Sequence, residues 1–342
     1  MDQQHKQNKQ NKQDKQYIQD QKQEMRGRVT EVRRNRYVID FEDRSIPAGL
    51  KGSFYGQPAE DLPIVGDYVS FLYNPAGDSV IRSVYERKSL LKRPDQAKTG
   101  VMQYMAANAD YCFIITALNE DYSYNRIARY ASIALQGGVT PVAVLTKADL
   151  CEDAGKYVRE VKTISDRLRV HAVSALYGTG MGELEEYFAP GKTICLIGSS
   201  GSGKSTLVNA VAGEEIMRTG EVRASDSTGR HTTTHRQLVR LKNGVSVIDM
   251  PGMREIGMAE TEEGISDTFA DIAELESRCR FRNCRHDTEP GCAVKAALAG
   301  GELSMQRWML YRALGTENTD NRAGKKKISV LAKEYKKLSK KR

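Results

Sequence analysis

The sequence predicts an α/β protein of three domains, with a small all-β domain in front of the central domain and a short helical module behind it. Its length of 342 residues exceeds the usual size of one compact domain. After residue 24, short β-rich segments alternate with Gly, Pro, Asn and Asp clusters, and from about residue 109 apolar strands alternate with amphipathic helices. Three cysteines and a histidine then crowd into residues 279–292, a pattern typical of a metal site.

Composition indicates a globular protein of the cytoplasm. Hydrophobic residues make up 39% and charged residues 28% of the chain, and no apolar run approaches the roughly 20 residues that span a bilayer. Residues 1–24 lack the apolar stretch of a secretory signal, and their acidic residues argue against a transit peptide. We therefore expect a cytoplasmic protein without a membrane segment, and we take a monomer as the default.

The two ends of the chain differ in composition from the rest. Residues 1–24 contain nine Gln and five Lys, which predicts a disordered extension. Residues 323–342 contain eight Lys and one Arg against one Glu, so this tail carries the net charge of +8. Such a tail can neutralise nucleic-acid phosphates, or it can be a solvated helix end. Between the ends we place a barrel at 25–90, the α/β domain at 91–256 and the helical module at 257–322.

The all-β domain has the length of a five-stranded OB-like barrel, an architecture that often binds RNA. We expect strands over residues 27–32, 37–41 and 68–73. The sequence does not distinguish an OB barrel from an SH3-like barrel. Five aromatic residues could serve as core or as stacking platforms for bases, and core is the expected role of most: Tyr37, Phe41, Phe54, Tyr55 and Tyr68.

The central domain shows the alternation of a mainly parallel sheet covered on both faces. We expect strands over residues 109–118, 141–146, 170–174, 193–198, 237–241 and 245–250, and helices over residues 124–136, near 157–168 and from residue 204.

The most specific motif lies where the strand 193–198 meets the next helix. The sequence Gly-Ser-Ser-Gly-Ser-Gly-Lys-Ser matches the P-loop pattern in the required strand-to-helix context. Its backbone N–H groups and the helix N-terminus suit phosphates. Lys204 would bind the β- and γ-phosphates and act in catalysis, and Ser205 would bind Mg²⁺. The predicted phosphate site comprises Gly198, Ser199, Ser200, Gly201, Ser202, Gly203, Lys204, Ser205 and Thr206.

A second motif indicates the base. Thr-Lys-Ala-Asp at 146–149 ends a strand and resembles the Asn-Lys-x-Asp motif that reads guanine in GTPases. Asp149 would accept hydrogen bonds from guanine N1–H and the exocyclic amine, and Lys147 would lie along the ring. An adenine reverses this donor pattern, so a carboxylate there rejects ATP. Threonine at position 146, in place of Asn, predicts weaker bracing of the loop. The predicted base pocket comprises Thr146, Lys147, Ala148, Asp149, Ser174 and Ala175.

The order of the motifs is that of a circular permutation. In ordinary GTPases the P-loop comes first and the guanine motifs last, whereas here the guanine motifs precede the P-loop. His-Thr-Thr-Thr at 231–234 and Asp-Met-Pro-Gly at 249–252 follow it. Because chain termini often lie close together in compact domains, the same pocket can still close.

With these motifs, and with Gly-Arg-His-Thr-Thr-Thr at 229–234 and Cys-Arg-Phe-Arg-Asn-Cys-Arg-His at 279–286, residues 25–308 resemble the bacterial ribosome small subunit-dependent GTPase A family. The resemblance implies that Asp249 holds Mg²⁺ through a water and that Gly252 donates its N–H to the γ-phosphate. Thr232 or Thr233 would close over Mg²⁺.

The residue after Gly252 is Met253, where many GTPases place a glutamine that orients water. Methionine cannot do this by hydrogen bonding, so we expect slow intrinsic hydrolysis that a partner accelerates. His231 is the catalytic candidate that could orient water instead; a structural or RNA-contacting role is the alternative.

Behind the GTPase motifs, the spacing Cys-x4-Cys-x-His-x5-Cys supplies three thiolates and an imidazole, which suits a closed, structural zinc site. The predicted ligands are Cys279, Cys284, His286 and Cys292. A redox or catalytic cysteine is the alternative. Four arginines interleave with the ligands and could grip RNA phosphates: Arg278, Arg280, Arg282 and Arg285.

The resemblance also implies a setting. We expect a GTP hydrolase stimulated by the small (30S) ribosomal subunit, which binds 16S rRNA, assists late 30S maturation and leaves on hydrolysis to GDP. Two alternatives stay open: a GTP-switched RNA-binding checkpoint protein whose hydrolysis only resets its state, and a P-loop ATPase acting on RNA.

Overall fold

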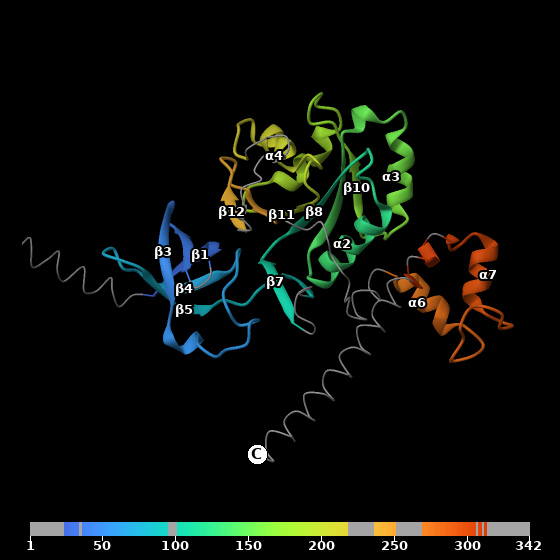
Figure 1. The fold of residues 1–342 in the computed structure, drawn as a ribbon, viewed down its shortest axis with the longest axis horizontal. Coiled ribbons are helices and arrows are strands. Elements are labelled where there is room, and N and C mark those ends of the chain that lie inside the picture. Colours follow the sequence, from blue (N-terminus) through green and yellow to red (C-terminus); the bar gives the residue numbers. More distant parts are fainter. Residues whose placement is uncertain are drawn as a thin grey trace, which may run out of the picture.

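The computed structural model describes residues 24–33, 36–94, 101–217, 236–250 and 269–312, the last range without residues 306 and 310. A barrel, an α/β domain and a helical module follow one another along the chain (Figure 1). No helix within these ranges is long and apolar enough to cross a bilayer. The tails and the motifs at 229–234 and 251–253 lie outside the described residues.

Five strands close into the N-terminal barrel. They are β1 (Glu24–Arg33), β2 (Arg36–Phe41), β3 (Arg44–Leu50), β4 (Tyr68–Leu72) and β5 (Ser79–Val84), with the 3-10 helix η1 (Gly52–Phe54) between β3 and β4. β1 pairs with both β2 and β4, and β3 runs parallel to β5. The resulting order β1-β2-β3-β5-β4 is that of an OB barrel, which resolves the choice that the sequence left open.

The barrel aromatics differ in burial. Tyr37 and Phe54 are buried in the barrel core, and Phe41 packs against that core. Tyr68 is half-buried under the guanidinium group of Arg26, whereas Tyr55 is 75% exposed. Most of these rings therefore stabilise the barrel.

A short antiparallel pair connects the barrel to the central domain. It consists of β6 (Leu90–Pro94) and β7 (Met102–Ala107). The N–H of Ala107 donates to Val65 O in the barrel at 3.0 Å, and the N–H of Leu90 donates to Gly137 O in the central domain at 2.9 Å. The pair is thus hydrogen-bonded to both neighbours.

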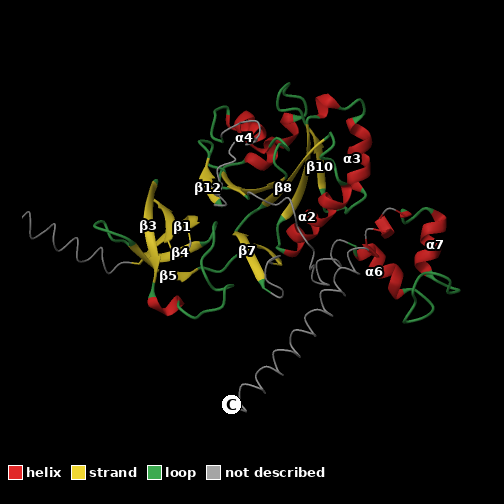
Figure 2. Ribbon diagram, in the orientation of Figure 1, coloured by secondary structure: helices red, strands yellow, loops and turns green. Residues whose placement is uncertain are grey.

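The central sheet has the order β10-β9-β8-β11-β13-β12. Its strands are β8 (Tyr111–Ala117), β9 (Thr140–Thr146), β10 (Arg169–Ala172), β11 (Thr193–Gly198), β12 (Gln237–Arg240) and β13 (Ser246–Asp249). Figure 2 shows β8, β10 and β12 of this sheet in yellow, with helices in red around them. All neighbours are parallel except β12 and β13. The parallel strands are nearly continuous apolar runs because both faces of the sheet are covered.

The sheet is the middle layer of three. The helices α2 (Tyr124–Gln136) and α3 (Ala154–Lys162) contribute to the core on one face. The helix α4 (Lys204–Ala212) and the 3-10 helix η3 (Met181–Phe188) contribute to the core on the other. With P-loop and guanine loops at the carboxyl ends of β11, β9 and β10, this arrangement places the predicted ligand site at one edge of the sheet.

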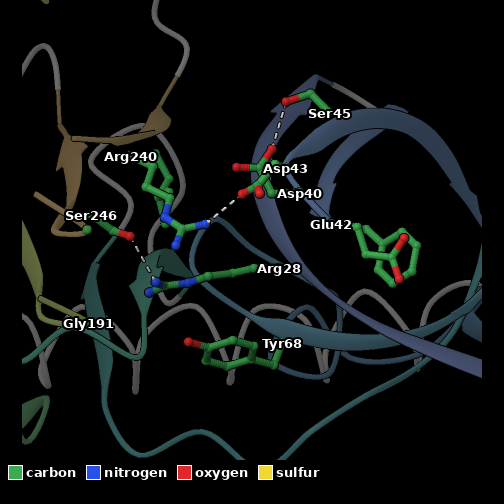
Figure 3. Close-up of a pocket in the computed structure, with 12 residues that line it drawn as sticks. Arg28, Asp40, Glu42, Asp43, Ser45, Tyr68, Gly191, Arg240 and Ser246 are labelled. Carbon is green, nitrogen blue, oxygen red and sulfur yellow. Dashed lines mark hydrogen bonds and ion pairs between the residues drawn. The ribbon is translucent and has the colours of Figure 1, made fainter. Parts of the chain in front are cut away.

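The barrel and the central sheet are joined strand to strand, since β1 pairs with β12 at Glu31 and Gln237. Arg28 spans the junction and donates to Thr193 Oγ1 at 2.8 Å and to Ser246 Oγ at 3.2 Å (Figure 3). A polar cavity of about 450 Å³ lies beside Arg28.

The C-terminal module contains α6 (Ala270–Ser277) and α7 (Ala293–Gly300). Arg307 ties it to the central domain: Nη1 donates to the carbonyl oxygens of Thr163 at 2.8 Å and of Ile164, directly after α3. Its Nε and Nη2 bind the carboxylate of Asp271 at 3.0 and 2.7 Å. The same guanidinium group lies over the ring of Phe269, with its Cζ atom 4.8 Å from the ring centroid.

One helix lies elsewhere than the sequence predicted. The helix expected near 157–168 spans Ala154–Lys162, because Asp153 caps its start by accepting from the N–H of Lys156 at 3.0 Å. It ends before Thr163, whose hydroxyl donates to Glu160 O at 2.7 Å. Bounds had been predicted for three of the five barrel strands, so β3 and β5 were expected without bounds, and β6 and β7 were not predicted.

Candidate functional site

The P-loop folds as its glycines require. Gly201 and Gly203 have φ angles of +79° and +93°, which side chains rarely adopt. At Gly198 a Cβ atom would lie 2.4 Å from Ile115 O, so only glycine fits. Ser202 Oγ donates to Ser199 O at 2.9 Å and closes the loop from within. This is the geometry of a phosphate cradle at the N-terminus of α4.

Lys204 folds back over this loop. Its Nζ donates to Gly198 O at 2.8 Å and to Ser199 O at 2.7 Å. Burial lowers the pKa of Lys204, and the carboxylates of Asp249 and Asp121 act in the opposite direction. The ammonium group is therefore held inside the loop, where it could contact a phosphate.

Asp249 ends β13 next to the P-loop strand β11, and Ser205 lies in the first turn of α4. Within the described residues, the buried atom Asp249 Oδ1 has no hydrogen-bond partner. Burial raises the pKa of Asp249, an effect that Lys204 opposes. A buried carboxylate oxygen without a partner, at the end of the strand next to the P-loop strand, fits a hydrated Mg²⁺ ion, because this ion prefers oxygen ligands.

The two loops predicted to read guanine lie side by side. The N–H of Ala148 donates to Val173 O at 3.1 Å, which ties the 146–149 loop to the 174–175 loop. Lys147 has a φ angle of +57°, a left-handed conformation that is uncommon for residues with a side chain and is enriched at functional sites. Ser174 is buried, whereas Asp149 is exposed. Asp149 can therefore meet a ligand base without further opening of the loop.

Thr146 contacts the P-loop directly. Its Oγ1 donates to Ser202 O at 2.5 Å, and Gly203 lies against the same side chain. A threonine hydroxyl thus makes a direct bond from the base loop to the phosphate loop.

Four predicted switch residues are not covered by the structure. His231, Thr232, Thr233 and Gly252 lie outside the described residues, as does Met253. Their assignment stays with the sequence.

The four predicted zinc ligands come together in the C-terminal module. Their ligand atoms all lie within 4.8 Å of one another. Cys279 Sγ lies 3.9 Å from Cys292 Sγ, close to the roughly 3.8 Å that separates two thiolates 2.3 Å from a tetrahedral zinc ion. His286 Nδ1 lies 3.4 Å from Cys292 Sγ. The donor set and its spacing fit Zn²⁺ with no open position.

Two contacts at these sites were not predicted from the sequence. Glu276 Oε1 lies 3.2 Å from His286 Nε2, so a carboxylate orients the imidazole from outside the ligand set. Asp121, in the loop after β8, accepts a hydrogen bond from Ser199 Oγ at 2.5 Å. Neither residue belongs to a motif; only the position of Asp121 after the carboxyl end of a strand could have indicated it.

Fold and site together define a circularly permuted P-loop GTPase with an OB barrel before it and a Cys₃His module after it. The guanine loops on β9 and β10 precede the P-loop strand β11 in the chain, yet β11 lies in the middle of the same sheet.

Comparison with known proteins identifies the family. The family model of the RsgA GTPase matches residues 84–259. The small ribosomal subunit biogenesis GTPase RsgA 2 of Listeria monocytogenes serotype 4b (strain F2365) is 44% identical over 292 residues, which cover 85% of this chain and 83% of that protein. The chain belongs to the RsgA GTPase family, hydrolases that act on GTP.

Solved structures agree with the fold. The crystal structure of YjeQ from Thermotoga maritima matches with a TM-score of 0.64 and 29% identity, over 87% of this chain and 99% of that one. The crystal structure of YloQ, described as a circularly permuted GTPase, matches with a TM-score of 0.61 and 24% identity, over 88% and 96%.

Proposed function

We propose that the site binds GTP together with Mg²⁺ and hydrolyses GTP to GDP and phosphate. The observation that carries this proposal is the direct contact between the base loop and the phosphate loop. Thr146 Oγ1 donates to Ser202 O, and the base loop is tied in turn to the loop that carries Ser174 and Ala175. One ligand could therefore meet all three loops at once.

Each loop has a distinct role in this proposal. The backbone N–H groups of 198–206 bind phosphate oxygens, and Lys204 leaves its loop carbonyls for the β- and γ-phosphates. Asp149 reads guanine, with Lys147 and Ala148 along the ring. Ser205 and Asp249 hold Mg²⁺, which when bound neutralises phosphate charge.

Hydrolysis by the isolated protein should be slow, since Met253 cannot orient water. Gly252 would contact the γ-phosphate, and Thr232 or Thr233 would close over Mg²⁺. His231 would orient the attacking water. These roles follow from the family resemblance.

We further propose that the small (30S) ribosomal subunit is the partner that accelerates hydrolysis, and that the protein assists late 30S maturation and leaves when GTP is hydrolysed. The name of the Listeria relative, a small ribosomal subunit biogenesis GTPase, supports this choice. An OB barrel and the arginines that interleave with the zinc ligands are surfaces suited to 16S rRNA. The basic residues at 323–342 would add phosphate contacts.

Zinc, in this proposal, is structural. Its four ligands connect the turn after α6 to the start of α7, where Cys292 also caps α7 by accepting from the N–H of Lys295 at 3.4 Å. A cytoplasmic monomer is the form we expect to act.

The deciding measurement is nucleotide turnover by the purified protein with GTP or ATP, with and without 30S subunits, at low salt. We expect turnover confined to GTP and strongly raised by 30S subunits. If 30S subunits did not change GTP turnover, the proposal that they are the partner would be refuted. A preference for ATP would refute the proposal that the base pocket reads guanine.

A further inference from the structure

The side chain of Asp121 accepts a hydrogen bond from the P-loop and is itself held by Arg126. Asp121 Oδ2 accepts from Ser199 Oγ at 2.5 Å, and Asp121 Oδ1 lies 3.0 Å from Arg126 Nη2. The loop that carries Asp121 is itself fixed, because the N–H of Asp121 donates to Asn119 Oδ1 at 3.0 Å. Ser123 begins α2 by accepting from the N–H of Arg126 at 3.3 Å. Asp121 is thus anchored to the first turn of α2.

We infer that Asp121 is a positioning residue of the nucleotide site, which fixes Ser199, the second residue of the P-loop, in the orientation that binds nucleotide phosphates. The inference rests on the proposed nucleotide site and adds to it a residue outside the P-loop.

The position of Ser199 explains why its orientation matters. Its carbonyl oxygen accepts from Lys204 Nζ at 2.7 Å and from Ser202 Oγ at 2.9 Å, so one peptide group sets both the lysine and the turn of the loop. Its side chain is buried and its hydroxyl points to Asp121. Without an acceptor, this hydroxyl would be a buried polar group without a partner, and the loop would rearrange to satisfy it.

The charge of Asp121 also argues for a role. A carboxylate near a site for polyphosphate repels the ligand, and the Coulomb cost falls only if a cation lies next to it. Arg126 supplies that cation at 3.0 Å, and both side chains are 26% exposed. The pair keeps the strong, charge-assisted acceptor for Ser199 while it limits the repulsion.

The test compares four variants of the full chain with the wild type: Asp121→Ala, Asp121→Asn, Ser199→Ala and the double variant Asp121→Ala/Ser199→Ala. Fluorescence titration with labelled GDP and GTP gives Kd, and steady-state turnover with GTP gives kcat and KM. Thermal unfolding is recorded for each protein. The control is Ser45→Ala, which removes a serine hydroxyl donated to an aspartate, Asp40, at 2.7 Å on the barrel (Figure 3).

We expect Asp121→Ala and Ser199→Ala each to weaken binding of both nucleotides about tenfold, the loss of one charge-assisted hydrogen bond. KM should rise with kcat nearly unchanged, because positioning acts on ground state and transition state alike. The double variant should bind no more weakly than Asp121→Ala. Asp121→Asn, which keeps an acceptor oxygen, should restore most of the affinity, and Ser45→Ala should bind like the wild type.

Three results would overturn the inference. Unchanged Kd values with a lowered Tm would make the contact purely structural, additive losses in the double variant would separate the two residues, and a fall in kcat at constant KM would place Asp121 in the chemical step. A wild-type protein that bound neither nucleotide would instead refute the proposed nucleotide site.

Discussion

Replacing Arg307 with alanine should release the C-terminal module from the central domain. The side chain is only 10% exposed and binds Asp271 through two nitrogens. It also donates to the carbonyl oxygens of Thr163 and Ile164, where the backbone leaves α3. Carbonyls at a helix C-terminus lack intrahelical donors and carry partial negative charge, so a guanidinium group there is favourable on both counts.

The size of the effect follows from what each partner loses. A hydrogen bond to a charged group contributes about 1.5 to 3 kcal/mol when both partners are buried. The carboxylate of Asp271 is 54% exposed, so water can replace much of the interaction that it loses, whereas Ile164 is fully buried and its carbonyl oxygen would lose a buried donor. We therefore expect the docking of the module to lose about 2 to 4 kcal/mol, a factor of roughly 30 to 700 in its opening equilibrium.

Hydrogen–deuterium exchange measures this opening directly. In Arg307→Ala the amides of α6 and of the segment 163–168 should lose protection by that factor, while the β8, β9 and β11 amides keep theirs. Arg307→Lys should recover only part of the loss, because an ammonium group cannot make the planar fork. Arg278→Ala is the control, since its contact with Glu274 is a 3.9 Å surface pair.

Unchanged protection in both segments of Arg307→Ala would refute this reasoning. It would mean that apolar contacts of Phe269 and Trp308, both buried in the shared core, hold the module without Arg307. Zinc content must be measured on the same samples, so that loss of metal is not mistaken for loss of docking.

Three further predictions concern the proposed ligands. In Asp149→Asn the side chain offers one donor and one acceptor, which complements xanthine. In a competition titration, affinity for GTP should therefore fall at least roughly 100-fold and affinity for XTP should rise. A variant that still preferred guanine would contradict the proposed base pocket. Asp249→Asn should lower Mg²⁺-dependent GTP turnover about 100-fold while GDP still binds, and normal turnover would exclude the carboxylate from the Mg²⁺ site. Cys284→Ser should reduce zinc, measured by plasma mass spectrometry, from one ion per chain to well below one, and full occupancy would contradict the Cys₃His set.

The elements with strong periodicity were predictable from the sequence. The helix α2 has the expected bounds, and the P-loop strand β11 spans the expected residues 193–198. Both depend on local signals: Ser123 caps α2, and a continuous apolar run ends at the first P-loop glycine. The bounds of β3 could not be assigned from the sequence, because it contains Pro47 and Gly49, which are typical of turns.

The motif residues of the site were predictable, and their cross-links were not. The P-loop, the base loops and the zinc ligands are each defined by spacing within one segment. By contrast, the bond from Thr146 to Ser202 joins residues 56 positions apart, and that from Asp121 to Ser199 joins residues 78 apart. Such contacts depend on which strands become neighbours, and the local pattern of each segment does not show this.

The permuted strand order also affects the growing chain during synthesis. Strand β8 finds β9 soon after it leaves the ribosome, but its other edge pairs with β11, which begins about 75 residues after β8 ends. At roughly 5 to 20 residues per second, that edge stays open for roughly 4 to 15 s. It is an apolar strand with unpaired backbone groups, the kind of surface to which another chain can attach. The half of the central domain that carries the proposed base loops is therefore exposed to aggregation until the half that carries the P-loop has been made.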